Sequence, residues 1–260
     1  MSSATVTLHT DAEIGVVTLN RPEALNAISG SVADQLAAAF REVGSRPDIW
    51  VMLLRAEGDK AFCVGADLKE RSTFTLEDFY SNRKQVRGMF HALRSVPQPT
   101  IAAVFGFALG GGFELALSCD LIVAAKGTML GLPEARVGLI PAGGGTQLLT
   151  HKVGMARSKE LIFTGRRFSA EEGREMGLIA RLASPEKLDS EAVALARAVL
   201  RCSPVAIREA KRAIEAAAGA SIEEGENIEH GAWERVIATE DRAEGIAAFN
   251  DKRAPEWSNR

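Results

Sequence analysis

Short apolar runs alternate with helical patterns along most of the chain, and this alternation restricts the fold more than any other feature of the sequence. Apolar or alternating runs occupy residues 5–10, 15–20, 49–58, 100–104 and 121–125. Over residues 32–43, apolar side chains recur every three or four positions, which is typical of an amphipathic helix. Parallel strands need long crossover connections, which are usually helices. The alternation therefore predicts an α/β fold with a mainly parallel sheet that begins with two paired strands.

The last quarter of the chain has helical patterns and no strand pattern. Helices are predicted at residues 188–200 and in segments that open at Ser203, near Ser221 and near Glu240. We expect an α/β core over residues 1–200, which would carry any functional site, and a helical region over residues 201–260. Exposed apolar stripes on such helices are often covered by another subunit, so this region is the candidate for oligomerisation.

The composition argues against several classes of protein. A formal net charge of -3 with interspersed signs disfavours binding of nucleic acid through a general basic field. The first residues lack the pattern of a signal peptide, and no apolar stretch approaches membrane-spanning length, so we expect a cytoplasmic protein without a membrane partner. Cys63, Cys119 and Cys202 are scattered without CxxC or CxxH spacing, so neither a disulfide framework nor a metal site is expected.

A glycine cluster offers the strongest local signal for a ligand site. Gly110–Gly112 follow the apolar run at 100–104 and precede a helical run. Glycines at such a junction let backbone NH groups approach a ligand, and the partial positive charge of a helix amino terminus would stabilise a developing oxyanion. Glu114 would lie in the first turn of that helix. The alternative is that the glycines only permit a tight turn and Glu114 is a favourable first-turn acid.

Two further clusters carry charged residues beside small ones. Within residues 61–70, Asp67 could cap a helix and Lys69 could meet a phosphate, although a solvated charged turn is the commoner explanation for either residue. Glu134 precedes a second glycine-rich turn at residues 141–147, and helix capping is its alternative role. If Glu114 and Glu134 shared one apolar pocket, their proton affinities would differ, because like charges resist ionising together. One acid and one base could then share a single water molecule.

Taken together, the motifs resemble those of the crotonase, or enoyl-CoA hydratase/isomerase, superfamily over nearly the whole chain. The matching segments are FCVGADLKE, IAAVFGFALGGGFELALSCDLIVAA and GLPEARVGLIPAGGGTQLL, in the family's order and spacing. The resemblance implies a spiral of ββα repeats followed by helices that form a trimer or a dimer of trimers. It also implies an acyl-CoA thioester substrate and no cofactor beyond the coenzyme A part of that substrate.

The resemblance also implies roles for individual residues. The backbone NH groups of Ala66 and Gly111 would form the oxyanion hole that polarises the thioester carbonyl. Glu114 would help to activate water for attack at the β carbon, and Glu134 would exchange a proton at the α carbon. Isomerases similar to this chain usually keep only the second acid, so the presence of both favours hydration.

Contacts with the coenzyme are implied on the same basis. The residues that match the family's substrate-binding positions are Ala24, Val64, Ala66, Asp67, Leu68, Lys69, Gly111 and Lys252. Lys252 would reach a phosphate across a subunit interface, or it is an ordinary surface lysine. The chain departs from many relatives at Glu23, where Lys or Arg is usual, and at Phe105 and Ala142. These departures bear on coenzyme affinity and rate more than on reaction type.

The leading hypothesis is an enoyl-CoA hydratase that converts a trans-2-enoyl-CoA into a 3-hydroxyacyl-CoA in fatty acid or branched-chain acyl-CoA degradation. The segment FCVGADLKER also resembles methylglutaconyl-CoA hydratases, and a 3,2-enoyl-CoA isomerase is a second enzymatic alternative. A non-catalytic acyl-CoA-binding or RNA-associated relative is the alternative from another class. The acyl pocket wall is expected from residues 76–93, whose placement would set the acyl chain length.

Overall fold

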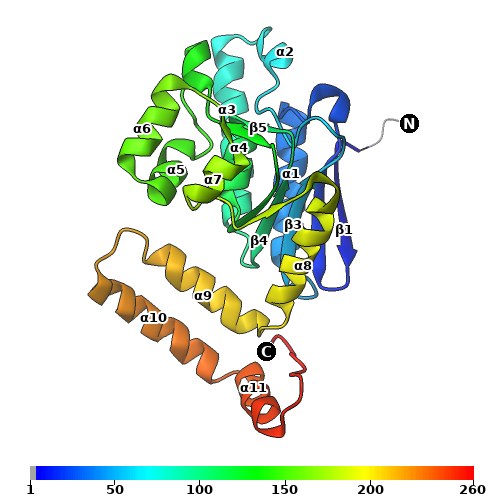
Figure 1. Ribbon diagram of the computed structural model, residues 1–260, viewed down its shortest axis with the longest axis vertical. Coiled ribbons are helices and arrows are strands. Elements are labelled where there is room, and N and C mark those ends of the chain that lie inside the picture. Colours follow the sequence, from blue (N-terminus) through cyan, green and yellow to red (C-terminus); the bar gives the residue numbers. More distant parts are fainter. Residues whose placement is uncertain (1–3) are drawn as a thin grey trace.

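Two sheets form the body of the protein in the computed structural model, which describes residues 4–260 (Figure 1). The larger sheet has the order β1-β2-β3-β4-β6-β9 and the smaller one β5-β7-β8. The strands are β1 (Val6–Asp11), β2 (Ile14–Leu19), β3 (Val51–Ala56), β4 (Thr100–Val104), β5 (Phe107–Leu109), β6 (Leu121–Ala125), β7 (Met129–Gly131), β8 (Phe168–Ser169) and β9 (Arg181–Ala183). In the larger sheet β1 pairs antiparallel with β2, and the pairs from β2 to β9 are parallel, which confirms the predicted α/β class.

Helices cover both faces of the larger sheet. Those of the body are α1 (Gly30–Ser45), α2 (Leu68–Arg71), α3 (Leu76–Arg94), α4 (Gly111–Ser118), α5 (Gly145–Val153), α6 (Met155–Thr164), α7 (Ala170–Glu175) and α8 (Leu188–Leu200). Successive side chains of a strand point to opposite faces, so Met52 and Leu54 of β3 pack with α1, α3 and α4, whereas Val51 and Leu53 pack against α8. The sheet is therefore buried on both sides.

A repeat of two strands and a helix organises the body. In one turn β4 enters the larger sheet, β5 enters a second layer, and α4 returns the chain. In the earlier turns the second-layer strand is reduced to single bridges, which pair Ile28 with Ala66 and Cys63 with Ala108. The spiral of ββα repeats implied by the resemblance is thus confirmed. Strands of one to three residues leave no periodic pattern, which is why the alternation along the sequence did not reveal the repeat.

The chain between β4 and α4 differs from the sequence-based prediction. Gly110–Gly112 were expected directly after the strand at 100–104, but β5 intervenes and carries the glycines into the second layer. The turn into β5 uses Gly106, with φ +58°, where an added Cβ would lie 2.0 Å from the carbonyl oxygen of Lys60. Only glycine fits so close to another backbone.

Three helices at the carboxyl end stand away from the sheets (Figure 1). They are α9 (Pro204–Ala216), α10 (Ile222–Ile237) and α11 (Glu240–Asp251), at the positions that the helical signals predicted. Lys211 of α9 joins this arm to the body, because its ammonium group donates to the carbonyl oxygens of Val96 and Gln98 and pairs with Asp120 at 2.8 Å. No helix within residues 4–260 is both long and apolar enough to span a membrane. Residues 1–3, which begin the segment judged to lack a signal peptide, lie outside the described residues.

Candidate active site

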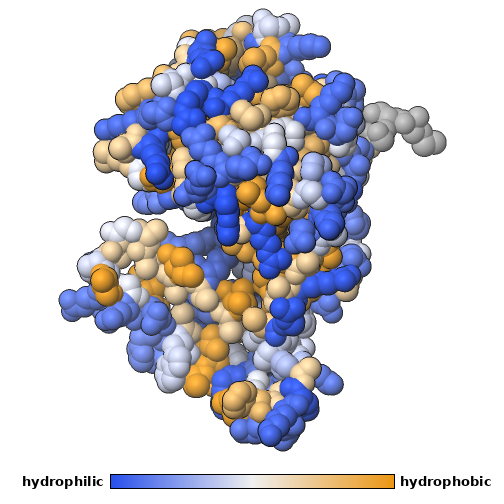
Figure 2. Space-filling view, in the orientation of Figure 1, coloured by the Kyte–Doolittle hydropathy of each residue, from blue (hydrophilic) through white to orange (hydrophobic). Residues whose placement is uncertain are grey.

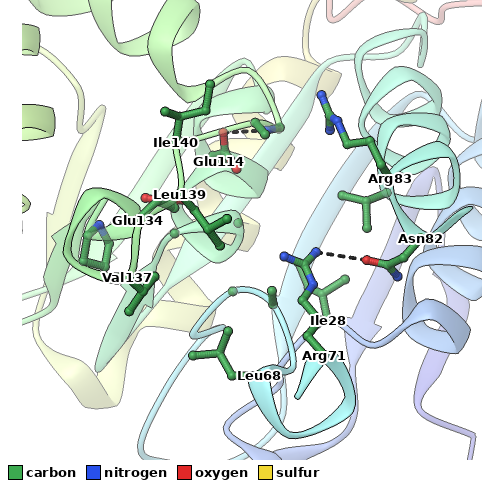
Figure 3. Close-up of a pocket in the computed structure, with 18 of the residues that line it drawn as sticks. Ile28, Leu68, Arg71, Asn82, Arg83, Glu114, Glu134, Val137, Leu139 and Ile140 are labelled. Atoms are coloured by element: carbon green, nitrogen blue, oxygen red, sulfur yellow. Dashed lines mark hydrogen bonds between the residues drawn. The ribbon is translucent and has the colours of Figure 1, made fainter. Parts of the chain in front are cut away.

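A cavity of about 400 Å³ opens where the second-layer strands end, and α3 forms one of its walls (Figure 3). Val64–Ala66 and Gly110–Gly111 contribute backbone to it, and Pro133–Val137 and the segment that follows contribute side chains. The wall from α3 consists of Phe79, Asn82, Arg83, Val86 and Phe90, which lie within the residues 76–93 that were expected to line the acyl pocket. Segments that are far apart in the sequence thus meet around one largely apolar space.

Two backbone NH groups at adjacent strand ends have no acceptor within residues 4–260. The amide of Ile28 donates to Gly65 and its carbonyl accepts from Asp67, so the NH of Ala66, between them, points away from that bridge. Gly111 is the first residue of α4, and first-turn NH groups have no intrahelical acceptor. A Cβ added at Gly111 would lie 4.0 Å from the nitrogen of Ala66, which shows that the two groups are neighbours. Both residues line the cavity and could donate to one oxygen atom.

Glu114 is buried in the first turn of α4, with an exposed fraction of 3%. Its Oε1 accepts hydrogen bonds from the NH groups of Gly143 at 2.6 Å and Gly145 at 2.8 Å. Burial raises the pKa of this carboxyl above its ordinary value, while these NH groups and the charge of Arg83 oppose the rise. The second glycine-rich turn therefore acts as a fixed hydrogen-bonding cradle that favours the ionised form.

Glu134 lies in the same cavity but in a different environment. It opens a short 3-10 helix, Glu134–Val137, just after β7. Burial, together with the nearby charge of Glu114, raises its pKa to about 7. Its Oε2 is buried and has no hydrogen-bond partner within residues 4–260. An unpaired buried carboxylate oxygen is costly, so the site favours a proton or a bound ligand on Glu134.

The other residues predicted for substrate binding divide into two groups. Val64 and Leu68 line the cavity together with the oxyanion-hole residues, whereas Ala24, Asp67, Lys69 and Lys252 do not. Asp67 has the helix-capping role that the sequence suggested, and it is not part of a solvated turn: Oδ1 accepts from the NH groups of Lys69 and Glu70, and Oδ2 pairs with Arg21 at 2.6 Å. Lys252 is exposed just after α11, in the helical arm.

Sequence reasoning missed the polar side chains on the α2 and α3 side of the cavity, Arg71, Asn82 and Arg83. A signal for Arg71 was present, because it lies three residues after Leu68 on the same helical segment and so shares a face with it. The segment after Glu134 was also missed as a wall, although Val137, Leu139 and Ile140 are large exposed apolar residues there. Within residues 4–260, no group of three or more His, Cys, Asp or Glu side chains is arranged to hold a metal ion.

Comparison with known proteins places this geometry in a family. The model of the enoyl-CoA hydratase/isomerase family matches residues 9–260. The chain belongs to this family. The crotonase superfamily, which the sequence motifs indicated, is therefore confirmed together with its fold. Membership of this family implies an acyl-CoA thioester as the substrate.

Individual family members are similar over nearly the full chain. A protein of Zymoseptoria tritici named enoyl-CoA isomerase/hydratase is 42% identical, with 95% of this chain and 84% of that protein covered. The mitochondrial enoyl-CoA hydratase domain-containing protein 2 of Mus musculus is 40% identical, with 93% and 83% covered. The crystal structure of an enoyl-CoA hydratase from Bacillus anthracis matches with a TM-score of 0.96 and 36% identity, covering 99% of this chain and 100% of that one. The names of these relatives include both hydratase and isomerase.

Proposed function

We propose that the protein is an enoyl-CoA hydratase that adds water to a trans-2-enoyl-CoA and yields a 3-hydroxyacyl-CoA. One observation carries this proposal: Glu114 and Glu134 line one cavity beside the backbone NH groups of Ala66 and Gly111. Burial raises the pKa of both carboxyl groups, but only Glu114 accepts hydrogen bonds from NH groups that stabilise its ionised form. Paired carboxyl groups of this kind can act as base and acid in one reaction.

In the proposed mechanism the thioester carbonyl accepts hydrogen bonds from the NH groups of Ala66 and Gly111. These donors stabilise the enolate that forms when the β carbon is attacked. Glu114, whose ionised form is stabilised by the NH groups of Gly143 and Gly145, accepts a proton from water as the water oxygen bonds to the β carbon. Glu134, protonated near neutral pH, gives its proton to the α carbon. Return of the proton from Glu114 to Glu134 completes the net addition of one water molecule.

A double-bond isomerase is the second candidate, because relatives with isomerase in their names belong to the same family. Isomerisation moves a proton between the α and γ carbons and needs a single carboxyl group, for which Glu134 would suffice. The buried Glu114 and its cradle of two NH groups would then have no task in the chemistry. A non-catalytic acyl-CoA binder or an RNA-associated protein would need neither acid, so hydration accounts for the most features.

The experiment follows the conjugated absorbance of crotonyl-CoA and the mass of the product. We expect loss of absorbance with gain of one water, and we expect Glu134→Gln to lower the rate by about two orders of magnitude or more. Conversion of a 3-enoyl-CoA into the conjugated isomer without any hydration would identify an isomerase instead. Tight binding of acyl-CoA without turnover of any enoyl-CoA would favour the binder.

The assembly, coenzyme contacts and pathway are also proposals. We propose a trimer or a dimer of trimers built through α9–α11, with Lys252 at a phosphate of the neighbouring subunit's ligand. Ala24 and Lys69 are proposed to contact the coenzyme outside the cavity. Degradation of fatty acids or branched-chain acyl groups remains the proposed pathway. A cytoplasmic location remains a prediction, and the mouse relative is named as mitochondrial.

A further inference from the structure

Arg94 is a charged residue that the proposed mechanism does not use, although it binds the turn that holds Glu114. It is the last residue of α3, and its Nη1 donates to the carbonyl oxygen of Gly143 at 2.8 Å. The same nitrogen donates to Oγ of Ser118, at the end of α4, at 3.3 Å. Arg94 is exposed and does not line the cavity, whereas Gly143 is buried. The guanidinium therefore reaches the second glycine-rich turn from outside the cavity.

The bond to Gly143 and the carboxylate of Glu114 lie on opposite sides of this turn. The peptide bonds within residues 4–260 are trans, so the carbonyl of Gly143 and the NH of Gly144, which share one peptide group, point in opposite directions. The carbonyl accepts from Arg94. The NH of Gly144, together with those of Gly143 and Gly145, lowers the pKa of Glu114 by hydrogen bonding (Figure 3).

Helix α3 fixes the position of the turn in two ways. A Cβ added at Gly143 would overlap the ring of Phe90 and would lie 2.8 Å from Oε2 of Glu114, so the turn is tightly packed between them. Phe90 and Arg94 are one helical turn apart, and the guanidinium lies 5.9 Å from the centre of the Phe90 ring. Contact with Phe90 prevents the turn from moving toward α3, and the hydrogen bond to Arg94 resists movement away from it.

The charge of Arg94 strengthens this arrangement. A guanidinium stays charged at any ordinary pH, and a hydrogen bond from a charged donor is about twice as strong as a neutral one. A cation at the carbonyl of a peptide group also polarises the group and makes its NH a better donor. Arg83 and Glu134, the other charged groups that face Glu114, line the cavity and have no hydrogen bond to Gly143–Gly145 within the described residues.

We propose that Arg94 is a positioning residue for hydration, which binds the outer side of the Gly143–Gly145 turn and so holds Glu114 in place to accept a proton from water. This inference rests on the proposed hydratase function and adds a residue to it. Arg94 has no contact with the cavity. Its loss should therefore impair the step that uses Glu114 and spare the steps that use Glu134 and the oxyanion hole.

The first test compares two reactions of one variant. Arg94→Met keeps an unbranched side chain but removes the charge and the donor. We expect kcat for hydration of crotonyl-CoA to fall by about tenfold or more, with KM within about threefold of the wild type. Exchange of the α protons of butyryl-CoA in D₂O should stay within about twofold, because it does not need Glu114. Equal losses in both reactions would indicate a general distortion of the cavity and would overturn the proposal.

Two further variants assign the effect to the hydrogen bond. Arg94→Lys keeps the charge and one donor group, so it should lose less hydration than Arg94→Met. Arg87→Met removes the same charge from the exposed face of α3 and should leave kcat within about twofold of the wild type. A loss in Arg87→Met as large as that in Arg94→Met would assign the effect to the net charge of the helix, and would contradict a role for the turn.

A titration of the free protein separates this inference from the proposed reaction. Carbon-13 NMR of glutamate carboxyl groups follows the ionisation of Glu114, whose signal is identified by its loss in Glu114→Gln. Arg94→Met removes a group that favours the ionised form, so it should raise the pKa of Glu114 by about 0.5 or more. The acid limb of the pH profile of kcat/KM should move to higher pH by the same amount, while the limb near pH 7 that is set by Glu134 should not move.

The outcomes of this titration are distinct. If no enoyl-CoA is hydrated but the pKa of Glu114 rises in Arg94→Met, the reaction fails and the positioning of Glu114 by Arg94 stands. If hydration occurs and Arg94→Met changes neither this pKa nor kcat, the role of Arg94 fails alone.

Discussion

Glu114 and Glu134 are chemically the same residue, and their surroundings give them different proton affinities. Two NH groups bind Oε1 of Glu114, whereas Oε2 of Glu134 has no hydrogen-bond partner within residues 4–260. Both acids could be predicted from the sequence, because each stands beside a glycine-rich turn that matches a known family pattern. For Arg71 the spacing from Leu68 indicated only a shared helix face, because its contact with Asn82 depends on where α3 lies in the fold.

The rate of hydration should depend on pH through both carboxyl groups. The profile of kcat/KM reports groups of the free enzyme. We expect it to fall as pH rises through about 7, because Glu134 then loses the proton that it must donate. It should also fall on the acid side, at a pH above the ordinary range of a glutamate, because burial raises the pKa of Glu114. A profile that stays flat or rises between pH 6 and 9, measured with crotonyl-CoA, would contradict these roles.

The stability of the protein should depend on the charge of Glu134. Its pKa is raised in the folded state, so the folded protein binds the proton more tightly than the unfolded chain does. The stabilising contribution is present below the unfolded pKa of about 4.5 and is lost as pH rises through about 7. Glu134→Gln should therefore raise Tm relative to the wild type by roughly 2–6 °C at pH 8.5, and the difference should shrink by pH 5. Thermal scans at both pH values measure this, and an advantage that grows toward acid pH would contradict the assignment.

At the scale of elements, the oxyanion hole depends on how closely two backbone segments approach. A Cβ added at Gly112 would lie 2.0 Å from the carbonyl oxygen of Cys63, so α4 can start beside the residues that precede Ala66 only because Gly112 has no side chain. The glycine motif and α4 were predictable, because strand-to-helix junctions have a recognisable composition. Strand β5 was not, since three residues within a longer apolar run carry no signal of their own.

A substitution at this contact should damage both folding and chemistry. Gly112→Ala should lower the stability by about 3 kcal/mol or more, or prevent folding, because backbone must move to admit the methyl group. Gly88→Ala is the control: it lies within α3, and nothing occupies the space around its added Cβ. Alanine there should be neutral or stabilise the helix by up to about 1 kcal/mol. Chemical denaturation of both variants provides the comparison, and equal stabilities would show that the close approach does not matter.

At the scale of the whole molecule, the helical arm, α9–α11, exposes several large apolar side chains. Figure 2 shows apolar residues gathered on the face of the arm over α9 and α10. In α9 only Pro204 is buried, and in α10 only Ala232. The large apolar side chains left exposed on the arm are Ile214, Ile222, Trp233, Ile237, Ile246 and Phe249. The positions at which these helices begin were predictable from the sequence, but the surface that would cover them was not, because a surface on another subunit leaves no pattern in this stretch of the chain.

Self-association through this arm gives a prediction about size in solution. Phe249, with an exposed fraction of 83%, would lie in the proposed subunit interface. Phe249→Asp should weaken association by about tenfold or more, because it places a charge on apolar surface that association would bury. Asn250→Asp adds the same charge one residue away and serves as the control. Light scattering after size-exclusion chromatography should give a trimer or hexamer for the wild type and the control, and a smaller species for Phe249→Asp. A monomeric wild type would contradict the prediction.

The division of labour between the two acids can be measured directly by comparing hydration with exchange of the α protons in D₂O. Exchange at the α carbon of butyryl-CoA needs the oxyanion hole and Glu134, whereas hydration of crotonyl-CoA also needs Glu114. We predict that Glu114→Gln loses hydration by about two orders of magnitude or more but keeps α-proton exchange, and that Glu134→Gln loses both. Hydration at the wild-type rate by either variant would contradict the two-acid mechanism.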